Sequence, residues 1–128
     1  MKKSIVTMIA FGLLLVMCLS ACAQTQFPNG TFVYVSRGDY KLDYVLELHD
    51  DGTWVHYINQ EIGSFGTYSI KGNEFVFVTD DYCDADQTGP ANYIWTFEDG
   101  ILSFTVKGSD PCVGRSMFIN NTRYKKQP

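Results

Sequence analysis

The sequence predicts an all-β domain, an eight-stranded antiparallel up-and-down barrel with one disulfide. Apolar and polar residues alternate with a period of two in many short segments, as they do in strands with one buried face. Turn residues interrupt these segments about every 8–12 positions, and no helical period follows the N-terminal segment. An open sheet of this kind would leave two exposed edges, so a closed barrel is favoured over the runner-up, a two-sheet β-sandwich.

The first 21 residues are expected to be a lipoprotein signal peptide that lies outside the fold. Lys2 and Lys3 precede an apolar run from Ile5 to Val16. The tetrad LSAC at 19–22 resembles a bacterial lipobox, which implies cleavage before Cys22 and acyl chains, palmitate included, on this cysteine. An uncleaved membrane helix is the alternative, but the apolar run is short for a span of about 20 residues.

Lipidation of Cys22 implies a location in the cell envelope. Several acyl chains hold a protein stably on a membrane without crossing it, so residues 22–29 are expected to be a lipidated polar tether on the extracytoplasmic side. The membrane is either the cell membrane or an outer membrane. In a cell with two membranes, Ala23 in place of aspartate favours the outer one by the same resemblance.

The expected mature chain, Cys22 to Pro128, is acidic. Loss of Lys2 and Lys3 from ten basic residues leaves eight against fourteen acidic ones, a formal charge of −6. Since no basic stripe offsets this charge, we expect no nucleic-acid partner.

Two cysteines remain for a disulfide. Cys18 leaves with the signal peptide and Cys22 is acylated, so Cys83 and Cys112 are expected to pair in an oxidising compartment. A disulfide that closes a loop of about 30 residues contributes about 3–4 kcal/mol to the free energy of unfolding in the chain-entropy model. A metal site is the alternative, but there is no CxxC motif and no nearby histidine.

The eight expected strands are short and are separated by turn residues. They cover residues 30–35, 41–48, 54–58, 66–70, 74–79, 93–98, 101–106 and 114–119. The domain therefore spans residues 30–119, and residues 120–128 are expected to be a frayed polar tail.

Turn residues mark where the first five expected strands end. Arg37-Gly38-Asp39 ends the first strand, and Asp50-Asp51-Gly52 forms a three-residue hairpin loop that carries Leu48 over to Trp54. Residues 59–65 are expected to be a loop. Gly72-Asn73 then joins the fourth and fifth strands, with Lys71 and Glu74 opposite each other as a surface charge pair.

The sixth and seventh strands form the clearest hairpin. A long acidic loop, residues 80–91, precedes them and holds Cys83. Asp99-Gly100 supplies a two-residue turn of type I′, which needs positive φ at both central residues. This turn pairs Phe97 with Leu102, so the apolar residues of both strands share one face.

The residues predicted to face the interior are mostly aromatic. They are Leu42, Tyr44, Leu46, Leu48, Trp54, His56, Ile58, Tyr68, Ile70, Phe75, Phe77, Tyr93, Trp95, Phe97, Leu102, Phe104 and Val106. An eight-strand barrel is just wide enough to be filled by side chains or to hold one small ligand. Aromatic side chains that each bury roughly 150–250 Å² favour filling, and both outcomes stay open.

Gly30-Thr31-Phe32 opens the first strand with a glycine, a spacer and an aromatic residue, and Arg115 stands near the end of the domain. These positions, with the patterns GTY, YxWxFxxGxLxF and DPCxxR, resemble the calycin and lipocalin-like group, in particular small bacterial lipocalin-like proteins. The resemblance implies a meander barrel in which Arg115 packs across the aromatic of the first strand. It also implies that Gly30, Phe32 and Arg115 close the barrel and that the interior holds a small hydrophobic molecule.

Three predicted inward residues have polar tips, namely His56, Tyr68 and Tyr93. Buried tips need hydrogen-bond partners, so they either satisfy one another or orient a ligand whose bulk meets the aromatic residues. Together with Trp54 and Trp95 they form the predicted ligand-binding set. A lone inward histidine is also suited to sense pH or a ligand.

Arg115 is expected to be structural, because a guanidinium stacks on an aromatic ring while it pairs with a carboxylate such as Asp110. The run Asp84-x-Asp86-x-x-Gly89 begins like a calcium loop, but its twelfth position is Trp95 instead of glutamate. We therefore expect no metal and no cofactor.

No group of residues suggests catalysis. Asp43 and Glu47 share an outer strand face but are four residues apart, roughly 13 Å, which is too far for joint acid–base work. We expect a binding protein for a small hydrophobic or aromatic molecule. The alternative is a filled barrel that contacts another envelope protein as an interaction, inhibitor or assembly module.

Overall fold

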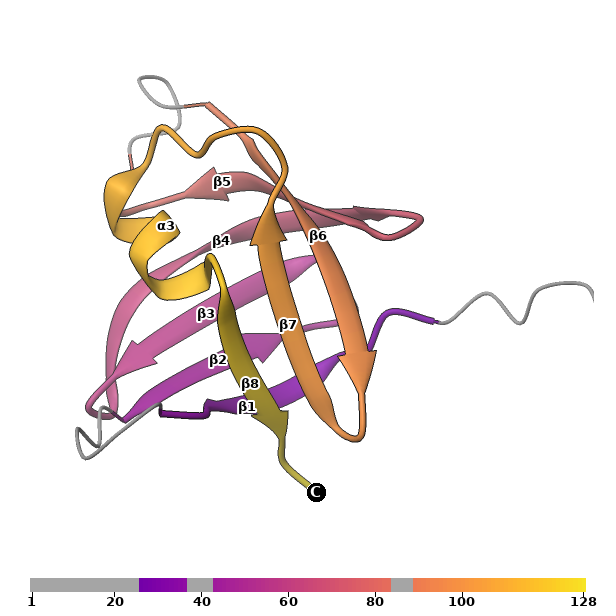
Figure 1. Cartoon of the computed structure of the whole chain (residues 1–128). Helices are drawn as coiled ribbons and strands as arrows, with labels where there is room; N and C mark the ends of the chain where they lie inside the picture. The colour runs from indigo at the N-terminus through magenta and orange to yellow at the C-terminus, as the bar shows by residue number, and fades with distance from the viewer. Residues whose placement is uncertain (1–25, 37–42, 84–88) are drawn as a thin grey trace, which may run out of the picture.

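Eight antiparallel strands close into one barrel, each strand pairing with its neighbours in the sequence and β8 pairing with β1 (Figure 1). The computed structural model describes residues 26–36, 43–83 and 89–128. The elements are β1 (Gly30–Tyr34), β2 (Tyr44–Leu48), β3 (Thr53–Ile58), β4 (Glu61–Lys71), β5 (Glu74–Asp80), β6 (Ala91–Glu98), β7 (Ile101–Val106), α3 (Val113–Ile119) and β8 (Thr122–Lys126). The prediction of an up-and-down barrel is confirmed.

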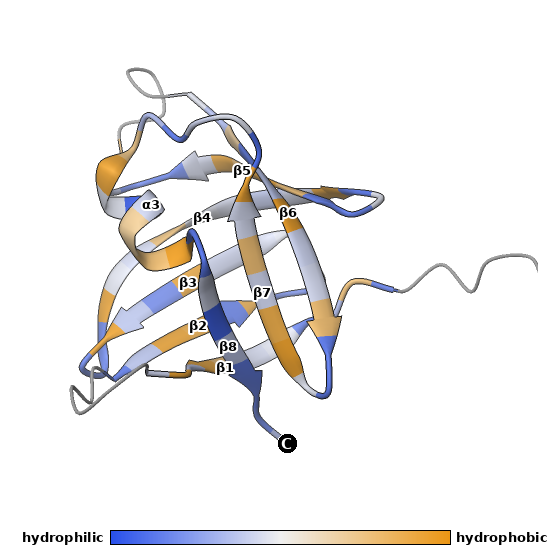
Figure 2. Ribbon diagram, in the orientation of Figure 1, coloured by the Kyte–Doolittle hydropathy of each residue, from blue (hydrophilic) through white to orange (hydrophobic). Residues whose placement is uncertain are grey.

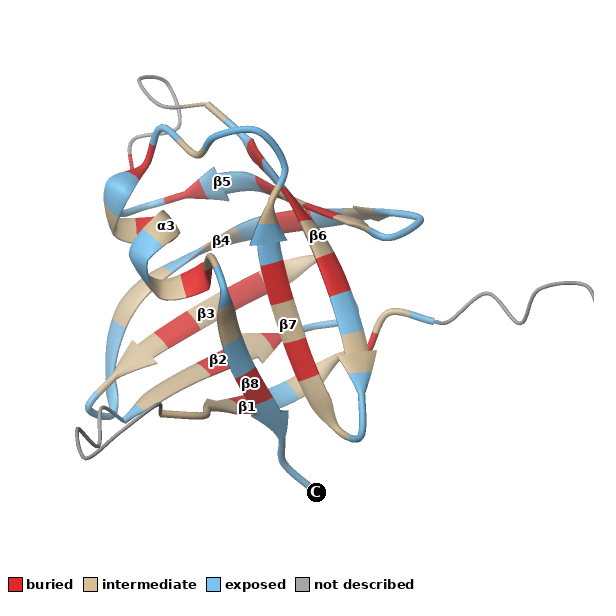
Figure 3. Ribbon diagram, viewed as in Figure 1, coloured by how far each residue is buried: buried red, intermediate tan, exposed pale blue. Residues whose placement is uncertain are grey.

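The predicted hairpin registers are confirmed. Leu48 pairs with Trp54 across β2 and β3, and Phe97 pairs with Leu102 across β6 and β7. Asp99 and Gly100 have φ of 52° and 75°, the values that a type I′ turn needs. Buried and exposed residues alternate along β6 and β7 (Figure 3), as the sequence predicted.

The prediction that residues 59–65 form a loop is wrong. Asn59 and Gln60 make a tight turn with φ of 51° and 69°, and β4 begins at Glu61. A bulge follows, since His56 pairs with Ser64 and Tyr57 pairs with Ile62, so that Gly63 has no partner opposite. The extra residue interrupts the alternation of period two and hides the start of the strand.

The eighth strand was predicted at the wrong place. Residues 114–119 belong to the helix α3, and the barrel is closed by β8, which lies in the predicted frayed tail. Figure 2 shows that β8 is mostly hydrophilic. Tyr124 is its one fully buried residue, because a closing strand needs few apolar residues when its outer face meets water.

The interior consists of aromatic and aliphatic side chains, largely those predicted. Tyr44, Ile58, Ile70, Phe97 and Val106 are only partly buried, and Leu42 lies outside the described residues. The buried predicted residues are Leu46, Leu48, Trp54, His56, Tyr68, Phe75, Phe77, Tyr93, Trp95, Leu102 and Phe104. The core also includes residues that were not on the predicted list: Phe32, Ala91, Ile119 and Tyr124.

The two ends of the barrel are closed differently. We call the end with the turns at 49–52, 72–73 and 99–100 the hairpin end, and the opposite one the α3 end. At the hairpin end the Phe27 ring packs at 5.1–5.7 Å, between centroids, from the rings of Tyr68, Phe75 and Trp95. The predicted polar tether is therefore packed against the core from Phe27 onward.

Two smaller expectations also change. Lys71 and Glu74 are opposite each other, but Glu74 forms its salt bridge with Lys107. The predicted acidic loop begins one residue later than expected, because Asp80 is the last residue of β5. Residues 84–88, which carry most of the calcium-like run, lie outside the described residues.

Candidate functional site

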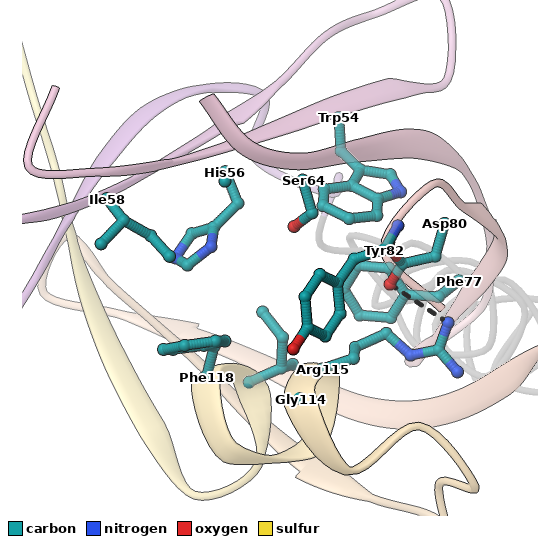
Figure 4. Close-up of a pocket in the computed structure, with 12 residues that line it drawn as sticks. Trp54, His56, Ile58, Ser64, Phe77, Asp80, Tyr82, Gly114, Arg115 and Phe118 are labelled. Atoms are coloured by element: carbon teal, nitrogen blue, oxygen red, sulfur yellow. Dashed lines mark hydrogen bonds and ion pairs between the residues drawn. The ribbon is translucent and has the colours of Figure 1, made fainter. Parts of the chain in front are cut away.

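A cavity of about 140 Å³ lies inside the barrel at the α3 end (Figure 4). Strands β3, β4 and β5 form one side of it, and the helix α3 forms the other. The lining residues are Trp54, His56, Ile58, Gly63, Ser64, Phe77, Asp80, Tyr82, Gly114, Arg115, Phe118 and Ile119. Most of this wall is apolar, and the polar groups are few, as in most small-molecule sites.

His56 is the buried polar residue without a partner. It is 2 % exposed, and among the described residues its Nε2 is the one buried side-chain nitrogen or oxygen that has no hydrogen bond. The ring lies 5.1 Å from the Phe118 ring and 5.5 Å from the Tyr44 ring, between centroids. Burial lowers the pKa of His56 to about 4, so the imidazole is neutral at pH 7.

Ser64 stands directly opposite His56 in the register of β3 and β4. Both side chains point into the cavity, with the Ser64 hydroxyl between His56 and Tyr82 in Figure 4. Within the described part of the chain this hydroxyl has no hydrogen bond. The bulge at Gly63 brings the two polar groups together, because it returns Ser64 to the inner face.

The cation in the cavity wall is already paired. Arg115 projects from α3, and its Nε and Nη2 each donate a hydrogen bond of 2.7 Å to Asp110. Its Nη1 lies 3.5 Å from the Asp80 carboxylate, and the guanidinium lies over the Phe77 ring, 5.5 Å from the centroid. The predicted pairing with Asp110 is confirmed. The aromatic residue beneath Arg115 is on β5, however, and is not the expected Phe32.

Each predicted tyrosine has its own partners. Tyr93 donates to Asp110 at 2.5 Å, and Tyr68 donates to the carbonyl of His49 at 2.7 Å. Burial, together with nearby Asp50 and Asp51, raises the pKa of Tyr68 to about 12. The alternative in which the three polar tips satisfy one another is therefore wrong, and His56 is the one without a partner.

The cavity contains part of the predicted binding set. Trp54 and His56 line it, whereas Tyr68, Tyr93 and Trp95 do not. Trp95 lies toward the hairpin end, where its Nε1 donates to the carbonyl of Gly72 at 3.2 Å. Sequence reasoning missed Gly63 and Ser64 from the bulged strand, and Phe118 and Ile119 from α3. It also missed Asp80 at the end of β5 and Tyr82 just after it.

The predicted disulfide is confirmed. Cys83 and Cys112 are bonded, with 5.8 Å between their Cα atoms, and they join the segment after β5 to the start of α3. Asp80 lies close to both sulfurs. Because the sulfurs are bonded to each other and the carboxylate pairs with Arg115, this cluster does not offer a metal site.

Comparisons with known proteins add no assignment. No protein-family model, no curated protein and no solved structure matches this chain. No helix in the described part of the chain has the length and hydrophobicity of a membrane span. The features of this chain that point to a function are therefore the cavity and the N-terminal sequence.

Proposed function

We propose that this protein is a lipid-anchored binding protein of the cell envelope, which holds one small hydrophobic or aromatic molecule in the cavity at the α3 end. The observation that carries the proposal is a cavity with mostly apolar walls that contains a buried histidine nitrogen with no partner. A buried polar atom without a partner is costly. A ligand that bonds to it removes this cost.

The size of the cavity sets the size of the ligand. Its volume is about 140 Å³, close to the roughly 150 Å³ of a dry apolar cavity that accepts benzene in another protein. Drug-sized ligands need about 300–1,000 Å³. The proposed ligand therefore has one ring or an equivalent short aliphatic body.

The anchor part of the proposal depends on the lipobox-like LSAC tetrad and acylation of Cys22. An anchor at Cys22 would lie at the hairpin end, because Phe27 packs against the barrel there. A chain that runs to the membrane from that end leaves the cavity unobstructed. The resemblance to small lipocalin-like lipoproteins supports the same combination of anchor and binding barrel.

Binding is tested first with toluene, an apolar single ring. NMR titration is expected to shift the indole N–H of Trp54, which lines the cavity, and to leave that of Trp95 unchanged. Ser64→Phe fills the cavity and is expected to abolish the shift. Ser69→Phe on the exposed face of the same strand is the matched control. Toluene-induced shifts that persist in Ser64→Phe would remove this cavity as the site.

The native ligand is sought by extraction. Protein purified from its own membranes is expected to release a small molecule that is absent from purified Ser64→Phe protein. Mass spectrometry identifies the released species, and equal release from both proteins contradicts the proposal.

The anchor is tested separately. Cys22→Ser is expected to abolish incorporation of labelled palmitate and to move the protein from the detergent phase to the aqueous phase. Cys18→Ser, four residues earlier in the expected signal peptide, is the control and retains the label.

One observation favours the alternative, an interaction module for another envelope protein. Ile62 and Phe65 are 63 % and 52 % exposed on the outer face of β4, next to partly buried Val55 and Tyr57 on β3. If this face binds a partner, Phe65→Asp removes a defined crosslink to that partner while Ser64→Phe retains it. A crosslink that persists in Phe65→Asp would exclude this face of β4 as the partner site.

A further inference from the structure

We infer that the cavity selects a neutral molecule with one ring and one hydroxyl group, the chemistry of a phenol, over the plain hydrocarbon and over the carboxylate of similar size. The inference rests on the proposed binding function and names the class of molecule that the site takes. Three features of the cavity carry it: a polar pair without partners, a paired cation, and a small aromatic enclosure.

The polar pair defines where the hydroxyl binds. His56 Nε2 is buried without a partner, and Ser64 lies opposite it in the strand register with an unbonded hydroxyl, considering the described residues. Both line the same cavity. A plain hydrocarbon would leave both groups unsatisfied after it displaced any water, so it gains only from apolar contact.

A hydroxyl group suits this pair better than most other polar groups. A neutral imidazole has one nitrogen that donates and one that accepts. A hydroxyl both donates and accepts, so it bonds to His56 Nε2 in either tautomer and leaves its other function for the Ser64 hydroxyl. A carbonyl oxygen only accepts hydrogen bonds, so it bonds to His56 Nε2 only in the tautomer that carries the proton on that nitrogen.

A carboxylate finds no free cation in this wall. Arg115, the one basic side chain among the described lining residues, already bonds to Asp110 twice and pairs with Asp80. Asp80 itself lines the cavity, so its charge opposes a second anion nearby. The neutral His56 supplies no positive charge in compensation, and burial of an unpaired carboxylate is strongly unfavourable.

The enclosure limits the molecule to one ring. Trp54, Phe77 and Phe118 supply aromatic walls around about 140 Å³. The Phe118 ring from α3 lies against both His56 and Tyr44, so the helix side of the cavity is aromatic as well. Aromatic rings pack edge to face against such walls, and a cavity of about this volume holds a single benzene ring in another protein.

The experiment compares phenol, toluene and benzoate on the full-length protein at pH 7, by NMR titration of the Trp54 indole signal. Phenol is expected to bind about three- to tenfold more tightly than toluene, the factor that corresponds to one net hydrogen bond. Benzoate is expected to bind at least roughly tenfold more weakly than phenol, because its charge is unpaired in the cavity.

Two variants assign the preference to the polar pair. His56→Phe removes the ring nitrogens and keeps an aromatic ring. Ser64→Ala removes only the hydroxyl oxygen, a smaller change, so this second variant still tests the inference if His56→Phe fails to fold. Each is expected to reduce the phenol-to-toluene ratio toward one while toluene affinity stays within about twofold. His49→Gln, at the exposed histidine of the hairpin end, is the control and keeps the wild-type ratio.

The outcomes separate this inference from the proposed function. If toluene and phenol bind equally in the wild type, or if Ser64→Ala and His56→Phe keep the preference, the hydroxyl class is wrong and the apolar binding site stands. If benzoate binds as tightly as phenol, the paired Arg115 does not disfavour an anion, and the preference for a neutral molecule is wrong. If no probe shifts Trp54, the binding function itself is overturned.

Discussion

His56 is the residue on which the chemistry of this barrel depends. A histidine inside a core normally donates or accepts at least one hydrogen bond, yet the Nε2 of His56 has no partner and its ring is surrounded by Tyr44 and Phe118. Such a residue destabilises the empty barrel, and it persists where a bound molecule offsets that cost. Its titration provides a test that does not need the ligand.

The stability of the barrel should depend on the protonation of His56. Its pKa falls from 6.5 to about 4 on folding because of burial. Above pH 6.5 the residue is neutral in both states. Between the two values it is protonated in the unfolded chain and neutral in the barrel, so acid favours unfolding, by about 3 kcal/mol at pH 4.

Urea unfolding of the wild type and of His56→Phe at pH 7.5 and pH 4.5 measures this difference. The wild type is expected to lose about 2–3 kcal/mol more than the variant. Asp80 and Arg115 face the same cavity but are present in both proteins, so their titration cancels. Equal losses in the two proteins would contradict a buried neutral histidine.

Gly66 is constrained by the backbone opposite it. A Cβ at this position would lie 2.0 Å from the carbonyl oxygen of Thr79 and 3.0 Å from Nε1 of Trp54. The backbone of a paired strand cannot move aside, so Gly66→Ala is expected to cost roughly 3 kcal/mol. Thermal or urea unfolding measures the loss.

Gly63→Ala is the matched comparison on the same strand. A Cβ there meets side-chain atoms of Ile58 at 2.8 Å, and a side chain adjusts at lower cost than a backbone. We expect this variant to lose less than half the stability that Gly66→Ala loses. The reverse order would show that the bulge at Gly63 is the more rigid position.

Among the elements, α3 depends most on the rest of the molecule. It has seven residues, and isolated helices shorter than about 12–15 residues are marginal in water. Its buried residues are Arg115 and Ile119, one turn apart, and the N-cap is Cys112, whose sulfur accepts a hydrogen bond from the Arg115 amide. The helix is therefore held by the Arg115 ion pairs and by the disulfide.

Removal of the disulfide is expected to loosen α3 before the strands. The bond spans a sequence separation of 29 residues, which corresponds to about 3–4 kcal/mol in the chain-entropy model. The double variant Cys83→Ser, Cys112→Ser should lose about that amount in urea unfolding. Hydrogen exchange should accelerate first at residues 113–119, and uniform acceleration across β6 and β7 would contradict this order.

The elements also show what the sequence could predict. The β6–β7 hairpin was predicted in full, because its alternation and its Asp-Gly turn agree with each other. In α3 the helical spacing of Arg115, Phe118 and Ile119 is present, but an arginine in the buried position conceals it. In β4 the bulge breaks the alternation. The cavity could not be predicted, since these two segments form much of its wall.

At the scale of the whole molecule, β8 makes the barrel a closed structure. It pairs with both β1 and β7 through residues of a mostly charged segment. Tyr124 is 0 % exposed, and its hydroxyl donates to the carbonyl of Phe118 at 2.8 Å. This bond links the closing strand to α3, so barrel closure and the helical wall of the cavity are formed together.

The two ends of the barrel also differ in what they hold. Phe27 packs at the hairpin end, and the cavity lies at the α3 end. Cys22 precedes Phe27 by five residues, a reach of at most about 18 Å. If Cys22 is acylated as proposed, the hairpin end therefore lies near the bilayer and the cavity opens away from it. A ligand then enters from the aqueous side without passing through the lipid.

The two tryptophans report this orientation, because one lies toward each end. Trp95 packs on Phe27 toward the hairpin end, and Trp54 lines the cavity. In lipidated protein bound to vesicles, a quencher attached to lipid headgroups is expected to quench Trp95 in the Trp54→Phe variant more strongly than Trp54 in the Trp95→Phe variant. A Cys22→Ser form that stays in solution should lose this difference. Stronger quenching of Trp54 would mean that the cavity faces the membrane and that its ligand comes from the lipid.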